Sequence, residues 1–324
     1  MRTISVVTPC YNEEGSVVEL YNRIKKAFEA LPHIGYQHLF IDNASQDGTV
    51  LKLRELAARD PRVKVILNAR NFGQIRSPMY GFLVARGDAV IVMASDLQDP
   101  PELIPELVCH WEGGARMVLG VKTSSDENKV IYWLRSRYYR LVRQLAGMET
   151  FEHVTGFGLY DRSVVEIIRK FDDPYPYFRG MLAEIGLPHV KVPYHQPQRS
   201  AGRTKNNIYT LYDLAILGIT SFSKAPLRLF TLFGFACSVV SVFLSLGYLA
   251  YKLIFWNRFS VGVAPIAIGL FFFASIQLIF IGILGEYVGV IHTHVLRRPL
   301  VIEAERINFD DDDALTTTHH ELSQ

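Results

Sequence analysis

The spacing of apolar residues divides the chain into two dissimilar halves. In the first half, short apolar runs rich in β-branched residues alternate with stretches in which apolar residues recur at helical intervals. Strands separated by helices are typical of an α/β fold with a mainly parallel sheet and helices on both faces. We predict strands at residues 3–8, 38–41, 63–67, 89–93 and 117–121, and helices at 17–28, 49–58 and 101–111. Ser16 is expected to cap the first helix, with Glu19 as its capping-box partner.

The second half contains two long apolar runs. No Asp, Glu, Lys or Arg occurs for 23 residues from Leu229 to Tyr251, or for 27 residues from Phe259 to Gly285. A helix of either length crosses the roughly 30 Å hydrocarbon core of a bilayer. A buried helix of a soluble protein seldom runs so long without a polar face. We therefore predict a membrane region at 226–290, with a hairpin of transmembrane helices at about 229–251 and 263–288.

Flanking charge predicts the orientation of this hairpin. Lys205, Lys224 and Arg228 precede the first run and Arg297 and Arg298 follow the second, whereas the short connector holds only two basic residues. Because basic flanks stay on the cytoplasmic side, we expect both ends of the chain in the cytosol. We expect no secretory signal, since the first apolar run is soon interrupted by two glutamates. The prediction is a multi-pass protein of the inner or plasma membrane with a cytoplasmic catalytic domain.

Two further segments border the membrane region. At 206–225, apolar residues at helical spacing and two tyrosines fit an amphipathic helix in the membrane interface, and they fit a core helix of the soluble domain equally well. We assign 1–205 to the soluble domain and 291–324 to a cytoplasmic C-terminal segment. Its tail, from Asp310 onward, opens with four aspartates and is expected to be solvated.

Composition and missing motifs narrow the classes of function. The chain has 34 Lys and Arg against 32 Asp and Glu, a net charge of +2, so no basic excess points to nucleic acid. Three widely separated cysteines suit a reducing compartment and form no metal-binding pattern. The dinucleotide motif G-x-G-x-x-G after the first strand, the P-loop G-x-x-x-x-G-K-[ST] and the elbow G-x-S-x-G are absent. Hydride transfer, P-loop nucleotide hydrolysis and serine hydrolysis are therefore disfavoured.

Polar residues gather after the predicted strands, where ligands of parallel sheets bind. They are Tyr11, Asn12 and Glu13 after the first strand, Asp42 after the second and Asp96 after the fourth. A carboxylate repels a diphosphate unless a divalent cation bridges the two groups. We therefore predict that Asp96 is a metal ligand. Asp99 belongs to the same cluster of oxygen donors as Asp96 and Gln98, but because it stands directly before two prolines we interpret it as the carboxylate that starts a helix rather than as a further metal ligand.

Seven short motifs occur in order along the chain. They are Thr8-Pro9-Cys10-Tyr11-Asn12-Glu13-Glu14, Ile41-Asp42-Asn43-Ala44-Ser45-Gln46-Asp47-Gly48-Thr49, Asn71-Phe72-Gly73, Asp96-Leu97-Gln98-Asp99-Pro100-Pro101-Glu102, Thr155-Gly156-Phe157-Gly158-Leu159-Tyr160-Asp161-Arg162, Tyr177-Phe178-Arg179-Gly180 and Arg199-Ser200-Ala201-Gly202-Arg203-Thr204-Lys205. Together with the apolar hairpin, this order resembles the family 2 glycosyltransferases of the GT-A fold. It is most similar to the polyisoprenyl-phosphate branch, which includes dolichol-phosphate mannosyltransferases and bactoprenol glucosyltransferases.

The resemblance implies a Rossmann-like GT-A domain and roles for particular residues. Pro9, Tyr11, Glu13, Asp42 and Asp96 would bind the nucleotide, and Asp96, the catalytic residue, would hold Mg²⁺ or Mn²⁺ together with Gln98. The residues expected at the donor and acceptor phosphates are Lys122, Arg137, Arg199 and Lys205.

The chain departs from the family pattern at three positions. Ala94 stands where the first Asp of Asp-x-Asp is usual, Asn43 stands for the second Asp of an Asp-Asp pair, and Gly156 stands where some members have a general-base Asp. The absence of a general base at Gly156 is compatible with transfer to a lipid phosphate, the acceptor that the resemblance implies. Such a phosphate is already anionic near neutral pH, because its second pKa lies near about 6. The attack on the sugar carbon therefore needs no base to remove a proton.

We expect an inverting transfer of a hexose, glucose from UDP-glucose, to polyisoprenyl (undecaprenyl) phosphate on the cytoplasmic face, for a cell-envelope glycan. Another sugar, such as mannose, amino-arabinose or N-acetylhexosamine, is one alternative. A non-catalytic scaffold or flippase partner is the other. Association into a homo-oligomer is expected, because apolar hairpins pack readily against one another.

Overall fold

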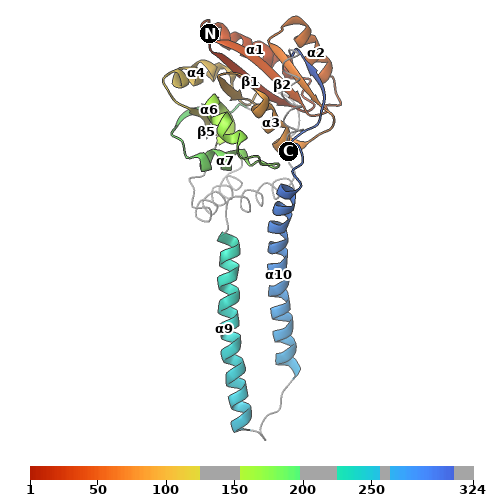
Figure 1. Cartoon of the computed structure of the whole chain (residues 1–324), viewed down its shortest axis with the longest axis vertical. Coiled ribbons are helices and arrows are strands. Elements are labelled where there is room, and N and C mark those ends of the chain that lie inside the picture. Colours follow the sequence, from red (N-terminus) through yellow and green to blue (C-terminus); the bar gives the residue numbers. More distant parts are fainter. Residues whose placement is uncertain (125–153, 198–224, 256–262, 310–324) are drawn as a thin grey trace. The chain divides into compact units, whose positions relative to one another are not determined.

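The computed structural model describes residues 1–124, 154–197, 225–255 and 263–309. Of these, 1–124, 154–197 and 297–309 belong to one compact unit, and 225–255 and 263–296 belong to a second (Figure 1). The first unit contains the predicted α/β domain and the second contains the long apolar helices. Residues 206–224 of the segment expected at 206–225 and the tail from 310 lie outside the described residues.

The first unit is built on a mixed sheet, which in the described residues has the strand order β7-β5-β6-β4-β1-β2-β3-β8. The strands are β1 Thr3–Cys10, β2 Gly35–Asp42, β3 Val63–Asn68, β4 Ala89–Val92, β5 Met117–Ser124, β6 Val154–Asp161, β7 His189–His195 and β8 Glu303–Ile307. The four strands β4, β1, β2 and β3 run parallel, whereas β6 and β8 are antiparallel to their neighbours β4 and β3. This confirms the predicted α/β class with a mainly parallel sheet.

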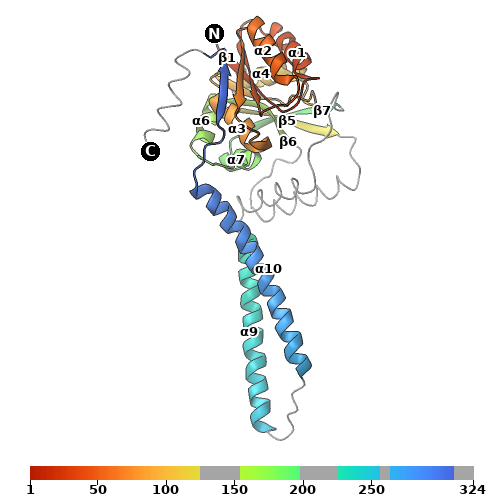
Figure 2. The same cartoon turned by 90° about the vertical axis from the view of Figure 1, so that its right-hand side faces the viewer.

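Helices cover both faces of this sheet (Figures 1 and 2). They are α1 Val17–Glu29, α2 Thr49–Arg59, α3 Gly73–Val84, the 3₁₀ turn η1 Pro101–Leu103, α4 Ile104–Glu112, α6 Arg162–Arg169 and α7 Phe178–Ile185. Because side chains of a strand alternate between faces, Ile4 and Val6 of β1 pack in the cluster that includes residues of α1 and α4. Val7 faces α3 on the other side, where a Cβ on Gly81 would lie 2.8 Å from it. The tight approach at Gly81 sets α3 close against the sheet.

One helix was missed, and one local expectation was wrong. The helix α3 was not predicted, because Gly73 at its start and Pro78 within it are residues that weaken helical patterns. Ser16 does precede α1, but its side chain caps no helical N–H. Its hydroxyl donates instead to the backbone and side-chain oxygens of Glu13, each at 3.2 Å. The capping box with Glu19 is therefore absent.

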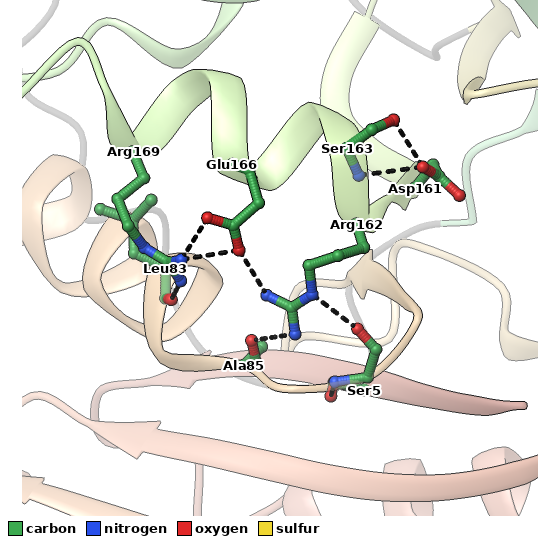
Figure 3. A network of polar contacts seen from close by, with 9 residues as sticks. Ser5, Leu83, Ala85, Asp161, Arg162, Ser163, Glu166 and Arg169 are labelled. Carbon is green, nitrogen blue, oxygen red and sulfur yellow. Dashed lines mark hydrogen bonds and ion pairs between the residues drawn. The ribbon is translucent and has the colours of Figure 1, made fainter. Parts of the chain in front are cut away.

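The amino-terminal end of β4 carries a network of polar contacts centred on α6 (Figure 3). The guanidinium of Arg162 donates to the carbonyl oxygens of Gly87 at 3.1 Å and Ala85 at 2.8 Å, and lies 3.5 Å from Glu166. Arg169 pairs with the same glutamate at 2.6 Å. These contacts fasten α6 to the loop between α3 and β4.

The chain that follows the apolar helices returns to the first unit as β8, at the outer edge of β3. Arg54 of α2 donates two hydrogen bonds to Glu305, at 2.7 and 2.5 Å. Asn308 donates to the carbonyl oxygens of Ala57 at 2.7 Å and Val63 at 2.9 Å. No strand was predicted within the C-terminal segment 291–324, and the structure adds β8 at residues 303–307.

The described part of the second unit contains the helices α9 Ala225–Ile254 and α10 Val263–Val295. They meet where the ring of Phe280 lies 5.3 Å from that of Phe230. Among the described residues, one segment, Phe272–Val295, is long and apolar enough to cross a membrane by length and composition, and α9 contributes the shorter apolar stretch Phe230–Ser241. Both predicted helices therefore form, whereas a pair of spans is not confirmed.

Candidate functional site

The sheet brings most of the predicted site residues to one edge. The carboxyl ends of β1, β2, β3 and β4 lie together because these strands are parallel. Lys122 of β5 lies opposite Tyr194 of β7, near the carboxyl ends of those strands and at the same edge. The predicted residues at or directly after these strand ends are Pro9, Tyr11, Glu13, Asp42, Asp96, Gln98 and Lys122. Arg137, Arg199 and Lys205 lie outside the described residues.

Each of the loops after β1, β2 and β4 contains a non-glycine residue in the left-handed region. These are Asn12 with φ 55°, Ala44 with φ 62° and Leu97 with φ 62°. Such a conformation is uncommon for side chains other than Asn, Asp and Gly, and it costs of order 1–3 kcal/mol for a residue such as Leu. Strained residues of this kind concentrate at ligand sites. The residues with left-handed backbone conformation therefore lie at the same edge of the sheet as the polar side chains.

The loops after β1 and β2 are bonded into one platform. The backbone N–H of Asn12 donates to the Ser45 hydroxyl at 2.9 Å, and the N–H of Glu13 donates to the Thr49 hydroxyl at 2.8 Å. The carboxylate of Glu14 accepts from the N–H of Gly48 at 3.0 Å, and a Cβ at Gly48 would stand 2.7 Å from it. These hydrogen bonds hold the loops of the first two motifs in a fixed position relative to each other.

Asp42 lies beneath this platform with 1% of its surface exposed. Its carboxylate accepts hydrogen bonds from the backbone N–H and the hydroxyl of Ser45, at 2.9 and 2.5 Å. Burial raises the pKa of Asp42, and these hydrogen bonds oppose the rise. The geometry gives Asp42 a part in holding the loop, and its contact with a nucleotide stays a prediction.

Asn43 explains one departure from the family pattern. Its amide group donates to the side-chain oxygen of Asn71 at 2.8 Å and to the carbonyl oxygen of Gly73 at 3.2 Å. Its own oxygen accepts from the N–H of Phe72 at 2.8 Å and from the amide of Asn68 at 3.2 Å. A carboxylate cannot donate, so an Asp here would face two acceptors. The Asn71-Phe72-Gly73 motif thus joins the platform through Asn43.

The loop after β4 holds the acidic residues. Asp96 is 8% exposed, and its Oδ1 accepts from the N–H of Gln98 at 3.2 Å. Asp99 is 5% exposed, and its two oxygens accept from the N–H of Ala94 and the hydroxyl of Tyr194, each at 3.0 Å. Burial raises the pKa of Asp99, while these two donors and the nearby Lys122 counteract the rise.

The interpretation of Asp99 as a helix-start carboxylate was wrong. The 3₁₀ turn that follows begins at Pro101 and has no side-chain cap. The carboxylate of Asp99 instead ties the acidic loop to β7, through a tyrosine 95 residues away in the sequence. Tyr194 was not predicted as a site residue, because nothing near it in the sequence marks this contact.

The donors at this edge suit a hard divalent cation only when a phosphate completes its coordination. Within the described part of the chain, no group of three or more His, Cys, Asp or Glu side chains is placed to hold a metal ion. Asp96 and Gln98 offer oxygen donors, and Mg²⁺ is usually bound by one or two carboxylates plus phosphates of the substrate. The residues present therefore fit a cation that arrives with a diphosphate.

Comparison with known proteins gives the family. The family model described as glycosyl transferase family 2 matches residues 5–169. An uncharacterized glycosyltransferase of Bacillus subtilis, YkcC, is 33% identical over 299 residues, 92% of each chain. The bactoprenol glucosyl transferase of Shigella phage SfII is 35% identical over 304 residues, which cover 92% of this chain and 96% of that protein.

Solved structures also match. Glucosyl-3-phosphoglycerate synthase from Mycobacterium tuberculosis, in complex with uridine-diphosphate, aligns with a TM-score of 0.48 at 18% sequence identity, over 68% of this chain and 79% of that one. The family match runs from β1 through α6, the part of the chain that builds the carboxyl edge. With relatives of this identity aligned over nine tenths of its length, the chain belongs to glycosyl transferase family 2 and has the family's GT-A-like α/β fold.

Proposed function

We propose that this protein transfers a hexose from a nucleotide sugar to the phosphate of a polyisoprenyl lipid, at the cytoplasmic face of a membrane. One observation carries the proposal: the platform and the acidic loop with Asp96 and Gln98 lie at one edge of the sheet, in a chain that also has two long apolar helices. Relatives named bactoprenol glucosyl transferases support both the lipid acceptor and glucose as the sugar. UDP as the carrier nucleotide follows from the family resemblance.

We assign the donor nucleotide to the platform of the first two loops. Tyr11 and Glu13 are half-buried at its rim and would contact the base and ribose beside Pro9. Asp42 would act in part through Ser45, because both of its oxygens are bonded to that residue. Mg²⁺ or Mn²⁺, held by Asp96 and Gln98, would supply positive charge to the diphosphate as it leaves.

We assign the acceptor to the β5 side of the same edge. An oxygen of the lipid phosphate would form the new bond to the anomeric carbon while the bond to the nucleoside diphosphate breaks. This single displacement inverts the anomeric centre and needs no nucleophile from the enzyme. Lys122 would attract the acceptor phosphate, since a fixed cation favours the approach of an anion. The proposal gives Arg137, Arg199 and Lys205 the same kind of role.

We also infer that the chain crosses the membrane an even number of times. The strands β1–β7 precede α9 and β8 follows α10, yet all of them belong to one sheet. A sheet cannot have strands on opposite sides of a bilayer, so a single crossing between them is incompatible with its formation. A crossing by α9 in addition to α10 satisfies this requirement. The basic flanks Lys224, Arg228, Arg297 and Arg298 support a cytoplasmic sheet.

The test is a sugar-transfer assay with the full chain in detergent. Radiolabelled nucleotide sugars are offered singly with short-chain polyprenyl phosphate, in Mg²⁺, in Mn²⁺ and in EDTA. We expect labelled lipid from one donor in the presence of metal, and a product of inverted anomeric configuration by NMR. Asp96→Asn is expected to lower kcat/KM by at least about 100-fold, as loss of one charge-stabilising group typically does.

Asp88→Asn is the matched control. It makes the same chemical change at an exposed residue at the opposite edge of the sheet, where the amino ends of the parallel strands lie (the amino edge). The carboxylate of Asp88 accepts a hydrogen bond from the N–H of Thr3 at 2.7 Å. An amide oxygen can accept the same bond, so transfer is expected to be unchanged. Folded protein that labels no lipid from any donor would exclude the enzyme and favour a scaffold role. Transfer that survives EDTA would exclude the metal.

A further inference from the structure

Two arginines lie over one aromatic ring at the β3 end of the carboxyl edge, and a third lies close to them. The guanidinium carbon of Arg70 lies 4.2 Å from the centroid of the Phe72 ring, and that of Arg76 lies 5.6 Å from it. Phe72 is itself buried, with 8% of its surface exposed. Arg76 also donates to the carbonyl oxygen of Pro299, which places Arg298 beside the pair. We call Arg70, Arg76 and Arg298 the arginine cluster.

The positive charge of the arginine cluster is not balanced by carboxylates. Arg23, Arg54 and Arg162 each pair with a glutamate. Within the described ranges, by contrast, the side chains of Arg70 and Arg76 donate to backbone oxygens, and the exposed Arg298 makes no side-chain hydrogen bond or ion pair. The Nε of Arg76 is buried without a hydrogen-bond partner among the described residues. An anion would balance the charge of the cluster.

Two further features favour an anion at this place. The helix α3 begins at Gly73, directly after Phe72, and has no acidic residue in its first turn. The amino end of a helix carries partial positive charge that stabilises anions. Burial and the neighbouring Arg70 and Arg298 lower the pKa of Arg76, as expected where cations are crowded.

The position of the cluster in the chain points to a lipid as the source of the anion. Arg298 follows the last residue of α10, Val295, by three positions. If α10 spans the bilayer, which is part of the function proposed above, Arg298 stands at the height of the lipid headgroups. We propose that the arginine cluster binds the phosphate group of an anionic membrane lipid. Planar guanidinium groups suit phosphate because they can donate two parallel hydrogen bonds.

This site is separate from the one proposed for the acceptor. Lys122 lies on β5, and five strand spacings separate β5 from β3 in the sheet. At about 4.8 Å per spacing, the two places are roughly 24 Å apart. A lipid at the arginine cluster would therefore hold the domain at the membrane while the acceptor occupies the other side of the same edge.

The test measures thermal unfolding of the full chain in detergent micelles as dioctanoyl phosphatidylglycerol is added. Dioctanoyl phosphatidylcholine and inorganic phosphate are added in parallel titrations. We expect only the anionic lipid to raise the Tm of the wild type. In the exposed pair Arg70→Gln/Arg298→Gln, the half-saturating concentration is expected to rise about fivefold for each arginine removed, or roughly 25-fold. The control variant Lys26→Gln/Arg59→Gln removes the same amount of charge from α1 and α2, and the half-saturating lipid concentration should stay that of the wild type.

Two results would overturn the proposal. An equal lipid response in the Arg70/Arg298 variant and the wild type would exclude the site. An equal rise in Tm from inorganic phosphate would assign the site to a free phosphate. Should the double variant fail to fold, Arg298→Gln alone carries the test, because its exposed side chain makes no hydrogen bond or ion pair with the residues that the structure describes. Sugar transfer, assayed separately without anionic phospholipid, shows whether the proposed function fails while the lipid site stands.

Discussion

The two edges of the central sheet are built from the same strands by opposite rules. At the amino edge, Arg162, Glu166 and Arg169 pair with one another and with backbone carbonyls (Figure 3). At the carboxyl edge, Asp99 is buried beside Asp96 and is held by neutral donors, an N–H and a tyrosine hydroxyl. Paired charges thus secure the fold at the amino edge, whereas the carboxyl edge, to which we assign the ligand, holds buried like charges and strained loops.

One motif contributes to both edges. The strand β6 is antiparallel to β4, so Gly158 of the Thr155–Arg162 motif lies opposite Val92 and Asp161 lies opposite Ala89. Arg162 consequently serves the amino edge, whereas Gly156 stands at the carboxyl edge. The two ends of this one short motif therefore lie at opposite edges of the sheet.

The largest expected effect on stability comes from the amino edge. Arg162→Ala removes the donor to the carbonyl oxygens of Ala85 and Gly87 and a partner of Glu166. We expect the free energy of unfolding in urea to fall by about 3 kcal/mol, because partly buried acceptors lose their bonds. The exposed Arg59→Ala should change it by less than about 0.5 kcal/mol. If sugar transfer per folded molecule falls as well, the two edges are not independent.

Asn43→Asp tests the platform with an intermediate effect. The new carboxylate would face the oxygens of Asn71 and Gly73, to which the amide now donates. We expect a loss of about 1–3 kcal/mol at pH 7. Acceptors around the carboxylate raise its pKa in the folded state, so the loss should shrink as the pH falls and the group is protonated.

The exposed Asn22→Asp on α1 is the matched change for this variant. It should alter neither the stability at pH 7 nor its dependence on pH. A platform that tolerates Asp at position 43 without loss would mean that the Asn43 amide is not what joins the loops.

Asp99→Asn gives the smallest expected effect and tests whether the carboxyl edge carries a cost in stability. Burial raises the pKa of Asp99 in the folded state, so the folded protein binds this proton more tightly than the unfolded chain does. The contribution of the carboxyl group is then favourable below its unfolded pKa and is lost as pH rises through the folded pKa.

We therefore expect Asp99→Asn to raise Tm by about 2–4 °C at pH 7.5, with the difference disappearing toward pH 4. An amide can accept from the Ala94 N–H and donate to the Tyr194 oxygen, so both contacts can be kept. Tyr194→Phe removes a donor and should instead lower Tm at pH 7.5. A neutral residue at position 99 that lowers Tm at every pH would remove the contrast between the edges.

The sequence alone predicted what depends on local pattern. β-Branched runs located the strands β1 to β5 within a few residues, because a buried parallel strand needs apolar side chains on both faces. The strand β8 escaped notice, since Glu303, Glu305 and Arg306 make it polar and it lies at an edge. Its place depends on contacts such as Arg54 with Glu305, which are 251 residues apart in the sequence.

In the candidate site too, features that depend on local sequence were predicted, whereas contacts between residues distant in the sequence were not. Residues at strand ends were placed correctly at one edge, because parallel strands bring their carboxyl ends together. The contacts of Asp99 were not predicted, because its partner, Tyr194, belongs to a distant strand. The left-handed conformations of Ala44 and Leu97 have no local signature either, since neither residue type favours them.

The late return of β8 has a consequence for biosynthesis. At roughly 5–20 residues per second on the ribosome, the outer edge of β3 waits tens of seconds between its own synthesis and that of its partner. In that interval the nascent domain exposes an unpaired strand edge, the kind of surface that chaperones protect and that aggregation exploits. If the chain crossed the membrane an odd number of times, β8 would lie on the opposite side of the membrane from β3, and the outer side of β3 would stay unpaired. If both apolar helices span the membrane as proposed above, completion of the sheet is conditional on their correct insertion.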